Sequence, residues 1–170
     1  MNYYLPIILW LIVFGTVFTF KIPKVKEELL VKLHHVSDGD TITVLASNGT
    51  KIRVRFAFID APERNQEFGV ESTSKLHDLL KNEPYFKVFR YHTIYGRVLA
   101  KVTTLAGLDL NREMVKDGYA WCFRRRCPKE YRQLQKLAKK NQIGLWKNPN
   151  PRSPWNYRKS PKTRQRNHTL

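Results

Sequence analysis

Residues 30–59 read LVKLHHVSDGDTITVLASNGTKIRVRFAFI and contain three β-branched segments separated by two turn signals. The first segment, residues 30–36, precedes Ser-Asp-Gly-Asp, and the second, residues 41–46, precedes Ser-Asn-Gly; both sequences suit tight turns. The third segment, residues 51–59, alternates basic with apolar side chains, which puts Arg55 on its polar face. The pattern predicts three antiparallel strands joined as a meander.

The rest of the chain adds two strands and three helices to this meander. Apolar spacing and turn signals predict strands at residues 85–91 and 98–104, and helices at residues 70–80, 110–116 and 128–142. In the first helix we expect Val70 to face inward and Ser72 outward. The elements together predict a mainly β, α+β fold: a five-stranded Greek-key barrel with about three flanking helices, preceded by an N-terminal hydrophobic helix.

That N-terminal helix is expected within residues 1–20. Residues 3–20, YYLPIILWLIVFGTVFTF, carry no charge and are just long enough to span a lipid bilayer. No basic residue precedes the segment and no small-residue cleavage motif follows it, which favours an uncleaved, single-pass membrane anchor over a signal peptide. The second choice is a protein secreted after signal cleavage.

Beyond the apolar segment the chain divides into three parts. We expect a charged connector, one folded domain and a basic disordered tail, at residues 21–30, 31–157 and 158–170. Frequent prolines and the lack of an apolar period make residues 148–170 extended or disordered. Trp155 and Tyr157 are the side chains there that we expect to pack back on the domain.

The charge of the chain points to a polyanionic partner. There are 31 Lys+Arg against 14 Asp+Glu, a formal net charge of +17 at pH 7. Nucleic acid and an anionic membrane surface are the two partners that such an excess attracts. Nothing in the sequence points to an obligate protein partner.

Two cysteines, Cys122 and Cys127, enclose four residues. No Cys-x-x-Cys pair or histidine cluster accompanies them, which excludes a structural zinc site. A short-loop disulfide and two free thiols both remain open, since spacing alone does not fix the Cα separation.

Four acidic residues stand in two of the predicted turns of this basic chain. Asp38 and Asp40 share one turn, and Asp60 and Glu63 follow the third strand, so the two turns can meet. Carboxylates gathered at one place repel each other unless a cation joins them, and hard oxygen ligands suit calcium or magnesium. Taken singly, each pair has a simpler explanation as ordinary turn residues.

Two arginines complete this constellation. Arg55 lies on the third strand, five residues before Asp60, and can point toward the same end; Arg97 follows Tyr95-Gly in a tight turn. A guanidinium binds two phosphate oxygens at once. With a divalent cation and a carboxylate that activates water, the set suits phosphodiester hydrolysis.

The order of these motifs resembles the thermonuclease or staphylococcal nuclease-like family. The matching runs are Asp38-Gly-Asp40-Thr41, Arg55-x4-Asp60-x-Pro62-Glu63 and Tyr95-Gly-Arg97, with Asn111-x-x-Met-Val-Lys-Asp-Gly118 and Gly144-Leu-Trp146 behind them. The resemblance covers about residues 31–157. It implies an OB-fold enzyme that hydrolyses DNA and RNA with calcium.

The resemblance also implies a role for each site residue. Asp40, Asp60 and the backbone carbonyl of Ala61 would hold the calcium ion. Glu63 would be the general base, or the group that orients the attacking water. The scissile phosphate would be clamped by Arg55 and Arg97, and Asp38 would add negative potential without binding the metal.

The contacts to nucleotide differ from those of the best-known secreted nuclease of this family. That enzyme has a lysine where this chain has Ile94, and tyrosines near the position of Phe123-Arg-Arg-Arg. Tyr95, Arg124 and Arg126 are the expected nucleic-acid contacts here, because arginine can stack on bases or bind phosphate.

Two alternatives and one conflict stay open. A non-catalytic OB-fold nucleic-acid-binding module would be expected to lack Glu63 or an arginine, and a lipid-binding membrane protein would not need the acid cluster. The lysines after the apolar segment favour a cytoplasmic domain, whereas a calcium requirement suits an extracytoplasmic one.

Overall fold

A computed structural model describes residues 23–160 and confirms the predicted five-stranded barrel. The strands are closed in the order β1-β2-β3-β6-β5. Their bounds are β1 Glu27–Asp38, β2 Thr41–Leu45, β3 Lys51–Phe56, β5 Phe86–Ile94 and β6 Arg97–Thr104. β3 and β6 run parallel, and the other neighbours run antiparallel.

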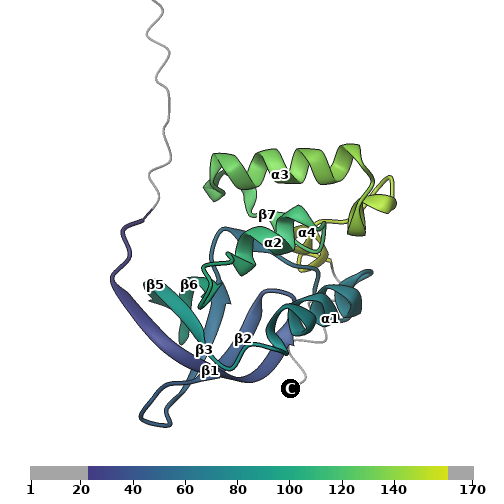
Figure 1. Ribbon diagram of the computed structural model, residues 1–170. Helices are drawn as coiled ribbons and strands as arrows, with labels where there is room; N and C mark the ends of the chain where they lie inside the picture. The colour runs from purple at the N-terminus through teal and green to yellow at the C-terminus, as the bar shows by residue number, and fades with distance from the viewer. Residues whose placement is uncertain (1–22, 161–170) are drawn as a thin grey trace, which may run out of the picture.

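The long first strand closes the barrel. β1 pairs with β5 over Glu27 to Val31 and with β2 over Lys32 to Asp38, and it curves beneath the other strands in Figure 1. It therefore begins earlier than the predicted segment 30–36 and takes in residues assigned to the connector. Irregular register on either side of His35 lets one strand serve two neighbours.

Four helices cover the barrel, and three of them are the predicted ones. They are α1 Gly69–Leu80, α2 Leu110–Lys116, α3 Lys129–Lys140 and a short α4 Pro154–Tyr157. α2 packs on β6, and α3 lies across α2 as an outer layer (Figure 1). Two 3₁₀ turns, η1 Arg124–Arg126 and η2 Gly144–Lys147, complete the described part.

The third strand is shorter than predicted. It ends at Phe56, and Phe58 has a positive φ of 69°, which turns the chain out of the barrel. The next two residues form β4 Ile59–Asp60, which pairs with β7 Trp121–Cys122 in a separate sheet. This break carries Asp60 away from β3 and toward the turn after β1.

The inward face of α1 also differs from the prediction. Val70 is 63% exposed, whereas Ser72 is fully buried and donates a hydrogen bond to the Tyr119 carbonyl at 2.7 Å. Leu76 and Leu80 do face the core, as the spacing requires. A small side chain is needed at 72 because the β1–β2 turn approaches the helix there.

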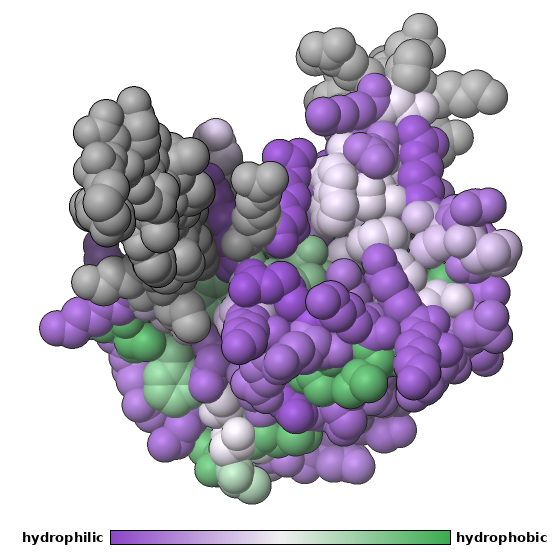
Figure 2. Space-filling view, turned by 90° about the horizontal axis from the view of Figure 1, so that it is seen from above, coloured by the Kyte–Doolittle hydropathy of each residue, from purple (hydrophilic) through white to green (hydrophobic). Residues whose placement is uncertain are grey.

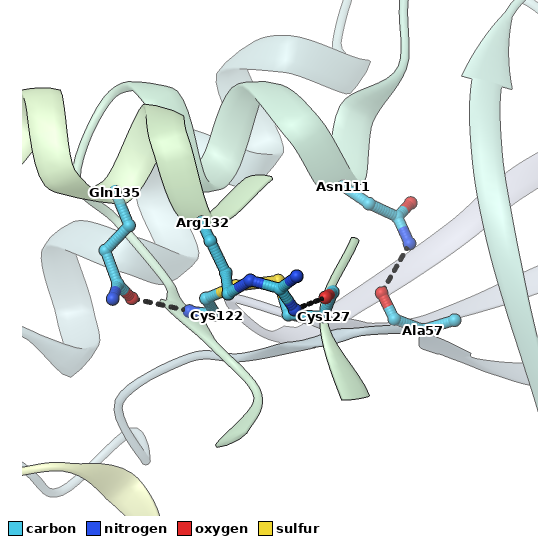
Figure 3. Close-up of a disulfide and its surroundings, with 6 residues drawn as sticks. All are labelled: Ala57, Asn111, Cys122, Cys127, Arg132 and Gln135. Atoms are coloured by element: carbon cyan, nitrogen blue, oxygen red, sulfur yellow. Dashed lines mark hydrogen bonds between the residues drawn. A yellow bond between two sulfur atoms is a disulfide. The ribbon is translucent and has the colours of Figure 1, made fainter. Parts of the chain in front are cut away.

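A buried side chain fastens α2 to the barrel. Asn111 donates to the Ala57 carbonyl at 3.0 Å (Figure 3). It also donates to the Ala100 carbonyl at 3.1 Å, and its amide oxygen accepts from the Val102 N–H at 3.0 Å. The bonds give partners to backbone groups at the parallel junction of β3 and β6, where the Ala100 carbonyl also accepts the Ala57 N–H at 2.7 Å.

The cysteine pair forms a disulfide. Cys122 and Cys127 are joined, with their Cα atoms 5.5 Å apart. Two side chains of α3 hold the loop: Gln135 accepts the Cys122 N–H at 2.7 Å, and Arg132 donates to the Cys127 carbonyl (Figure 3). The bridge ties β7 to the start of α3.

Residues 148–160, expected to be extended or disordered, contain the helix α4 and contact the rest of the domain. Trp155 packs edge-on against Trp121 with ring centroids 5.5 Å apart, and the Tyr157 hydroxyl donates to the Asn65 carbonyl at 2.9 Å. The prediction that Trp155 and Tyr157 pack back is confirmed. Their packing places the following residue, Arg158, at the barrel.

The surface is strongly hydrophilic. Figure 2 shows a polar face with only small, separated apolar patches. Exposed basic side chains of α3 are Lys129, Arg132, Lys136, Lys139 and Lys140. Within residues 23–160 no helix has the length and apolarity to cross a membrane, and the predicted anchor, residues 3–20, lies outside the described residues.

Candidate active site

The turn between β1 and β2 is pressed against α1. A Cβ atom on Gly39 would lie 1.9 Å from Oγ of Ser72 and 2.9 Å from Cβ of Ala61, so only glycine fits. The Asp38 side chain accepts the Asp40 N–H at 3.0 Å, which fixes the turn. This close approach brings Asp40 to the residues that follow β4.

Asp40 and Asp60 lie together, as expected of the two turns, but they meet at Arg55, which the resemblance assigned to the scissile phosphate. Nη2 of Arg55 lies 2.9 Å from Oδ2 of Asp40 and 2.8 Å from Oδ1 of Asp60. Its Nη1 donates to the carbonyls of Phe56 at 2.8 Å and Ile59 at 3.0 Å, which holds the guanidinium in the bend after β3. The Ala61 N–H donates to Oδ2 of Asp40 at 2.6 Å.

The carboxylate of Asp40 is buried, and its charge is only partly compensated by Arg55. Burial raises the pKa of Asp40 well above its usual value; the Arg55 guanidinium opposes the rise, and the charges of Asp38 and Asp60 add to it. Asp60 is only 1% exposed. Buried acids of this kind favour a bound cation, because a cation stabilises the charged form that burial disfavours.

Glu63 lies at the edge of the same group and has a partner that the sequence did not predict. Arg158, directly after α4, places Nη1 2.5 Å from Oε1 of Glu63 and Nη2 2.7 Å from Oδ2 of Asp60. Partial burial lowers the pKa of Arg158, but hydrogen bonds to the two carboxylates outweigh it and raise that pKa overall. The aromatic pair Trp155 and Tyr157 was the signal that this segment returns to the domain.

Arg97 enters from the hairpin between β5 and β6. Tyr95 and Gly96 have φ values of 49° and 69°, the left-handed pair that a two-residue hairpin requires. The turn sets Arg97 at the first position of β6 and leaves Tyr95 93% exposed. Arg97 lines the same cleft as the acidic group.

A single cleft of about 810 Å³ joins these residues. The predicted residues in its lining are Asp38, Asp40, Arg55, Asp60, Ala61, Glu63, Tyr95, Arg97 and Arg126. Apolar side chains, among them Phe58 and Phe123, line it as well. Arg124 is not part of the lining: its guanidinium lies 5.7 Å from the Phe123 ring centroid and 5.9 Å from that of Trp155.

The donor set fits a hard divalent cation. Asp40 and Asp60 each place a carboxylate oxygen within 2.9 Å of one position, which Nη2 of Arg55 occupies. Within residues 23–160 no three His, Cys, Asp or Glu side chains gather as metal ligands. Since calcium takes about six to eight oxygens, water, backbone carbonyls and substrate would complete the set.

Comparison with known proteins identifies relatives over most of the chain. Residues 53–148 match the family described as "Staphylococcal nuclease homologue". An "Uncharacterized endonuclease" of Haemophilus influenzae is 36% identical over 138 residues, 81% of this chain and 77% of the relative. A "Micrococcal nuclease" of Shigella flexneri is 36% identical over 138 residues, 75% of this chain and 79% of the relative.

A longer alignment covers nearly the whole chain. An "Uncharacterized endonuclease" of Escherichia coli is 31% identical over 164 residues, 93% of this chain and 98% of the relative. The family match spans β3 to η2 and so includes Arg55, Asp60, Glu63 and Arg97. The resemblance inferred from the motifs is confirmed: the chain belongs to the staphylococcal nuclease homologue family.

Proposed function

We propose that this chain is a nuclease that hydrolyses phosphodiester bonds of DNA, RNA or both, with calcium as its cation. The observation that carries the proposal is the guanidinium of Arg55 between Asp40 and Asp60, in a cleft shared with Glu63 and Arg97. Relatives named as nucleases support the reaction class. The choice of calcium rests on the all-oxygen donor set and on the family resemblance.

Each residue of the cleft has a role in this reaction. Asp40, Asp60 and the Ala61 carbonyl would hold the cation, which when bound polarises the phosphoryl oxygen. Glu63 would accept a proton from the attacking water or orient it. Arg97 would donate hydrogen bonds to phosphate oxygens, and Arg55 would do so once its carboxylates are otherwise neutralised.

The remaining residues of the cleft would bind the nucleic acid. Tyr95 offers an exposed ring for a base, and Arg126 offers a charge for the backbone. Arg124, which stacks on Phe123 and Trp155, would contact the strand only beyond the cleft. Asp38 would raise the negative potential at the cation and hold the turn.

A cleavage assay tests the proposal. The full-length chain, purified in mild detergent, is incubated with plasmid, single-stranded DNA and RNA, in calcium and then in excess chelator. Cleavage in calcium that stops in chelator is the expected result. Binding without cleavage would instead make the chain a non-catalytic nucleic-acid-binding module, and cleavage unaffected by chelator would remove the cation from the proposal.

We also propose that residues 3–20 anchor the chain in a lipid bilayer. The support is the uncharged length of that segment. Full-length chain expressed in cells should stay with membranes after alkaline carbonate washing, and a variant lacking residues 3–20 should not. Recovery of the full-length chain in the soluble fraction would contradict the anchor, and protease protection would show on which side the barrel lies.

A further inference from the structure

The carboxylate of Glu63 takes its orientation from outside its own loop. Glu63 lies between β4 and α1, and its side chain is 38% exposed. Within residues 23–160 the hydrogen bond or ion pair recorded for that carboxylate is the 2.5 Å contact with Arg158, 95 residues away in sequence. The loop's internal bonds, such as Gln66 N–H to the Glu63 carbonyl at 2.7 Å, fix the backbone and not the acid.

Further bonds join the same loop to the same C-terminal segment. Nε2 of Gln66 donates to the Arg152 carbonyl at 2.6 Å. The Tyr157 hydroxyl donates to the Asn65 carbonyl at 2.9 Å. Nδ2 of Asn148 donates to Oε1 of Glu67 at 2.9 Å. Residues 148–158 therefore bind the Glu63 loop at several points along its length.

An aromatic contact secures this segment to the domain. Trp155 packs against Trp121 of β7, and its ring lies 6.2 Å from that of Phe123. β7 in turn pairs with β4, which carries Asp60. The segment is thus held on the same small sheet that presents one of the proposed cation ligands.

One guanidinium spans two carboxylates with different tasks. Arg158 donates from Nη2 to Asp60, and from Nη1 to Glu63 and, at 3.3 Å, to Oδ1 of Asp60, so its planar fork fixes the spacing between the two carboxylates. Without it, two like charges would repel, and a half-exposed glutamate would sample several rotamers. The family match ends at residue 148, so Arg158 lies beyond the matched region, whereas Asp60 and Glu63 lie within it.

We propose that residues 148–158 are part of the active site and that Arg158 is a positioning residue for Glu63. The inference rests on the proposed nuclease function. Arg158 acts through Glu63: it holds the acid at a set distance from Asp60 before substrate enters. A misplacement of about 1 Å in such a group can cost on the order of a hundredfold in rate.

Three variants of the full-length chain test this role. R158A removes the contact, R158K keeps a charge without the fork, and K159A removes one positive charge from the exposed next residue as a matched control. We expect R158A to lower kcat about tenfold to a hundredfold, with KM within about twofold. R158K should recover part of kcat, and K159A should match wild type. Equal thermal midpoints would show that R158A remains folded.

A second measurement does not depend on activity. Hydrogen exchange of the metal-free protein should be faster at residues 63–67 in R158A than in K159A, and unchanged in α2. If wild type does not cut nucleic acid, the proposed function fails and this comparison alone decides the inference. Equal exchange in R158A and K159A would overturn it.

The kinetic outcomes are equally decisive. R158A that cuts as well as K159A would show that Arg158 does not position Glu63. R158A that cuts faster than wild type at limiting calcium would show that Arg158 merely competes with the cation for Asp60, which also overturns the inference. Loss of kcat with partial rescue by lysine supports it.

Discussion

Nη2 of Arg55 lies 2.8 Å from Oδ1 of Asp60, across a bend in which Arg55 also donates to two backbone carbonyls. The two residues stand five positions apart, on strands that belong to different sheets. The contact therefore couples the barrel to the small β4–β7 sheet, and it places a positive charge where the proposed cation would bind.

Replacing Arg55 with methionine should destabilise the metal-free protein and do so less in calcium. Two buried carboxylates lose their shared partner, a change that costs about 3–5 kcal/mol in comparable buried pairs. Urea unfolding of the full-length chain in chelator and in calcium measures the difference. Arg53 is exposed two residues earlier on β3, and R53M is the control. An equal loss in both solutions would count against a cation between Asp40 and Asp60.

Glu63→Gln should abolish most turnover and leave substrate binding intact. The amide keeps the shape of the side chain but cannot accept a proton, and loss of a general base costs about 10²–10⁴-fold. Single-turnover cleavage and binding in chelator give the two quantities. Glu71, exposed in the first turn of α1, supplies the control variant E71Q. A variant E63Q that cuts as fast as E71Q would remove Glu63 from the mechanism.

Gly39→Ala should disturb the site through packing. Its Cβ would meet Oγ of Ser72 at 1.9 Å, so either the turn or α1 must shift, at a cost of about 1–3 kcal/mol. In G39A, both the affinity for calcium, measured by calorimetry, and the free energy of unfolding should fall. Gly49, whose added Cβ would meet nothing within 4 Å, gives a comparison in which only backbone strain acts. Unchanged calcium affinity in G39A would show that the turn does not position Asp40.

Tyr95→Ala should weaken substrate binding without affecting stability. The ring is 93% exposed, so its removal should change the free energy of unfolding by less than about 0.5 kcal/mol. Loss of one stacked base costs about 1–3 kcal/mol, which raises KM about fivefold or more. Y85A, at a tyrosine that does not line the cleft, should leave KM unchanged. An equal KM for Y95A and wild type would exclude Tyr95 as a contact.

Reduction of the disulfide should lower stability by about 2 kcal/mol, the loop-closure value for a ring this short. The bridge joins Cys122 of β7 to Cys127 just before α3, so the stability should fall first in the loop between these two elements. Urea unfolding with and without reductant measures it. The double variant C122S/C127S should show no response to reductant; a response would mean that reduction acts elsewhere.

Much of the fold could be predicted because the ends of its helices and strands are set by residues that are close together in the sequence. The helix predicted at residues 110–116 has the same bounds in the structure. The Asp109 side chain accepts the Arg112 N–H at 3.1 Å at its start, and Gly118 follows its end with φ 73°. The five barrel strands were predictable for the same reason: each is long enough to show a period of two.

Other features lie beyond local patterns. β4 and β7 have two residues each, too few for any periodicity, and their pairing joins residues about sixty positions apart. Ser72 faces inward because the β1–β2 turn lies against it, a contact between distant segments. Arg158 was missed because its role depends on where Trp155 packs. The proposed ligands Asp40 and Asp60 were easier to propose from the sequence, because acidic residues are few in this basic chain and these two lie in neighbouring turn motifs.

The hydrogen bonds that Asn111 makes between α2 and the barrel limit which residues position 111 can tolerate during evolution. The short amide of Asn111 donates to two carbonyls and accepts one N–H. Aspartate keeps the shape but offers no donors, leucine fills the space but makes none of the three bonds, and glutamine moves the amide by one carbon. Substitutions on the exposed side of α2 should therefore be tolerated. A substitution of Asn111 should be tolerated only together with compensating substitutions where β3 and β6 meet beneath the helix.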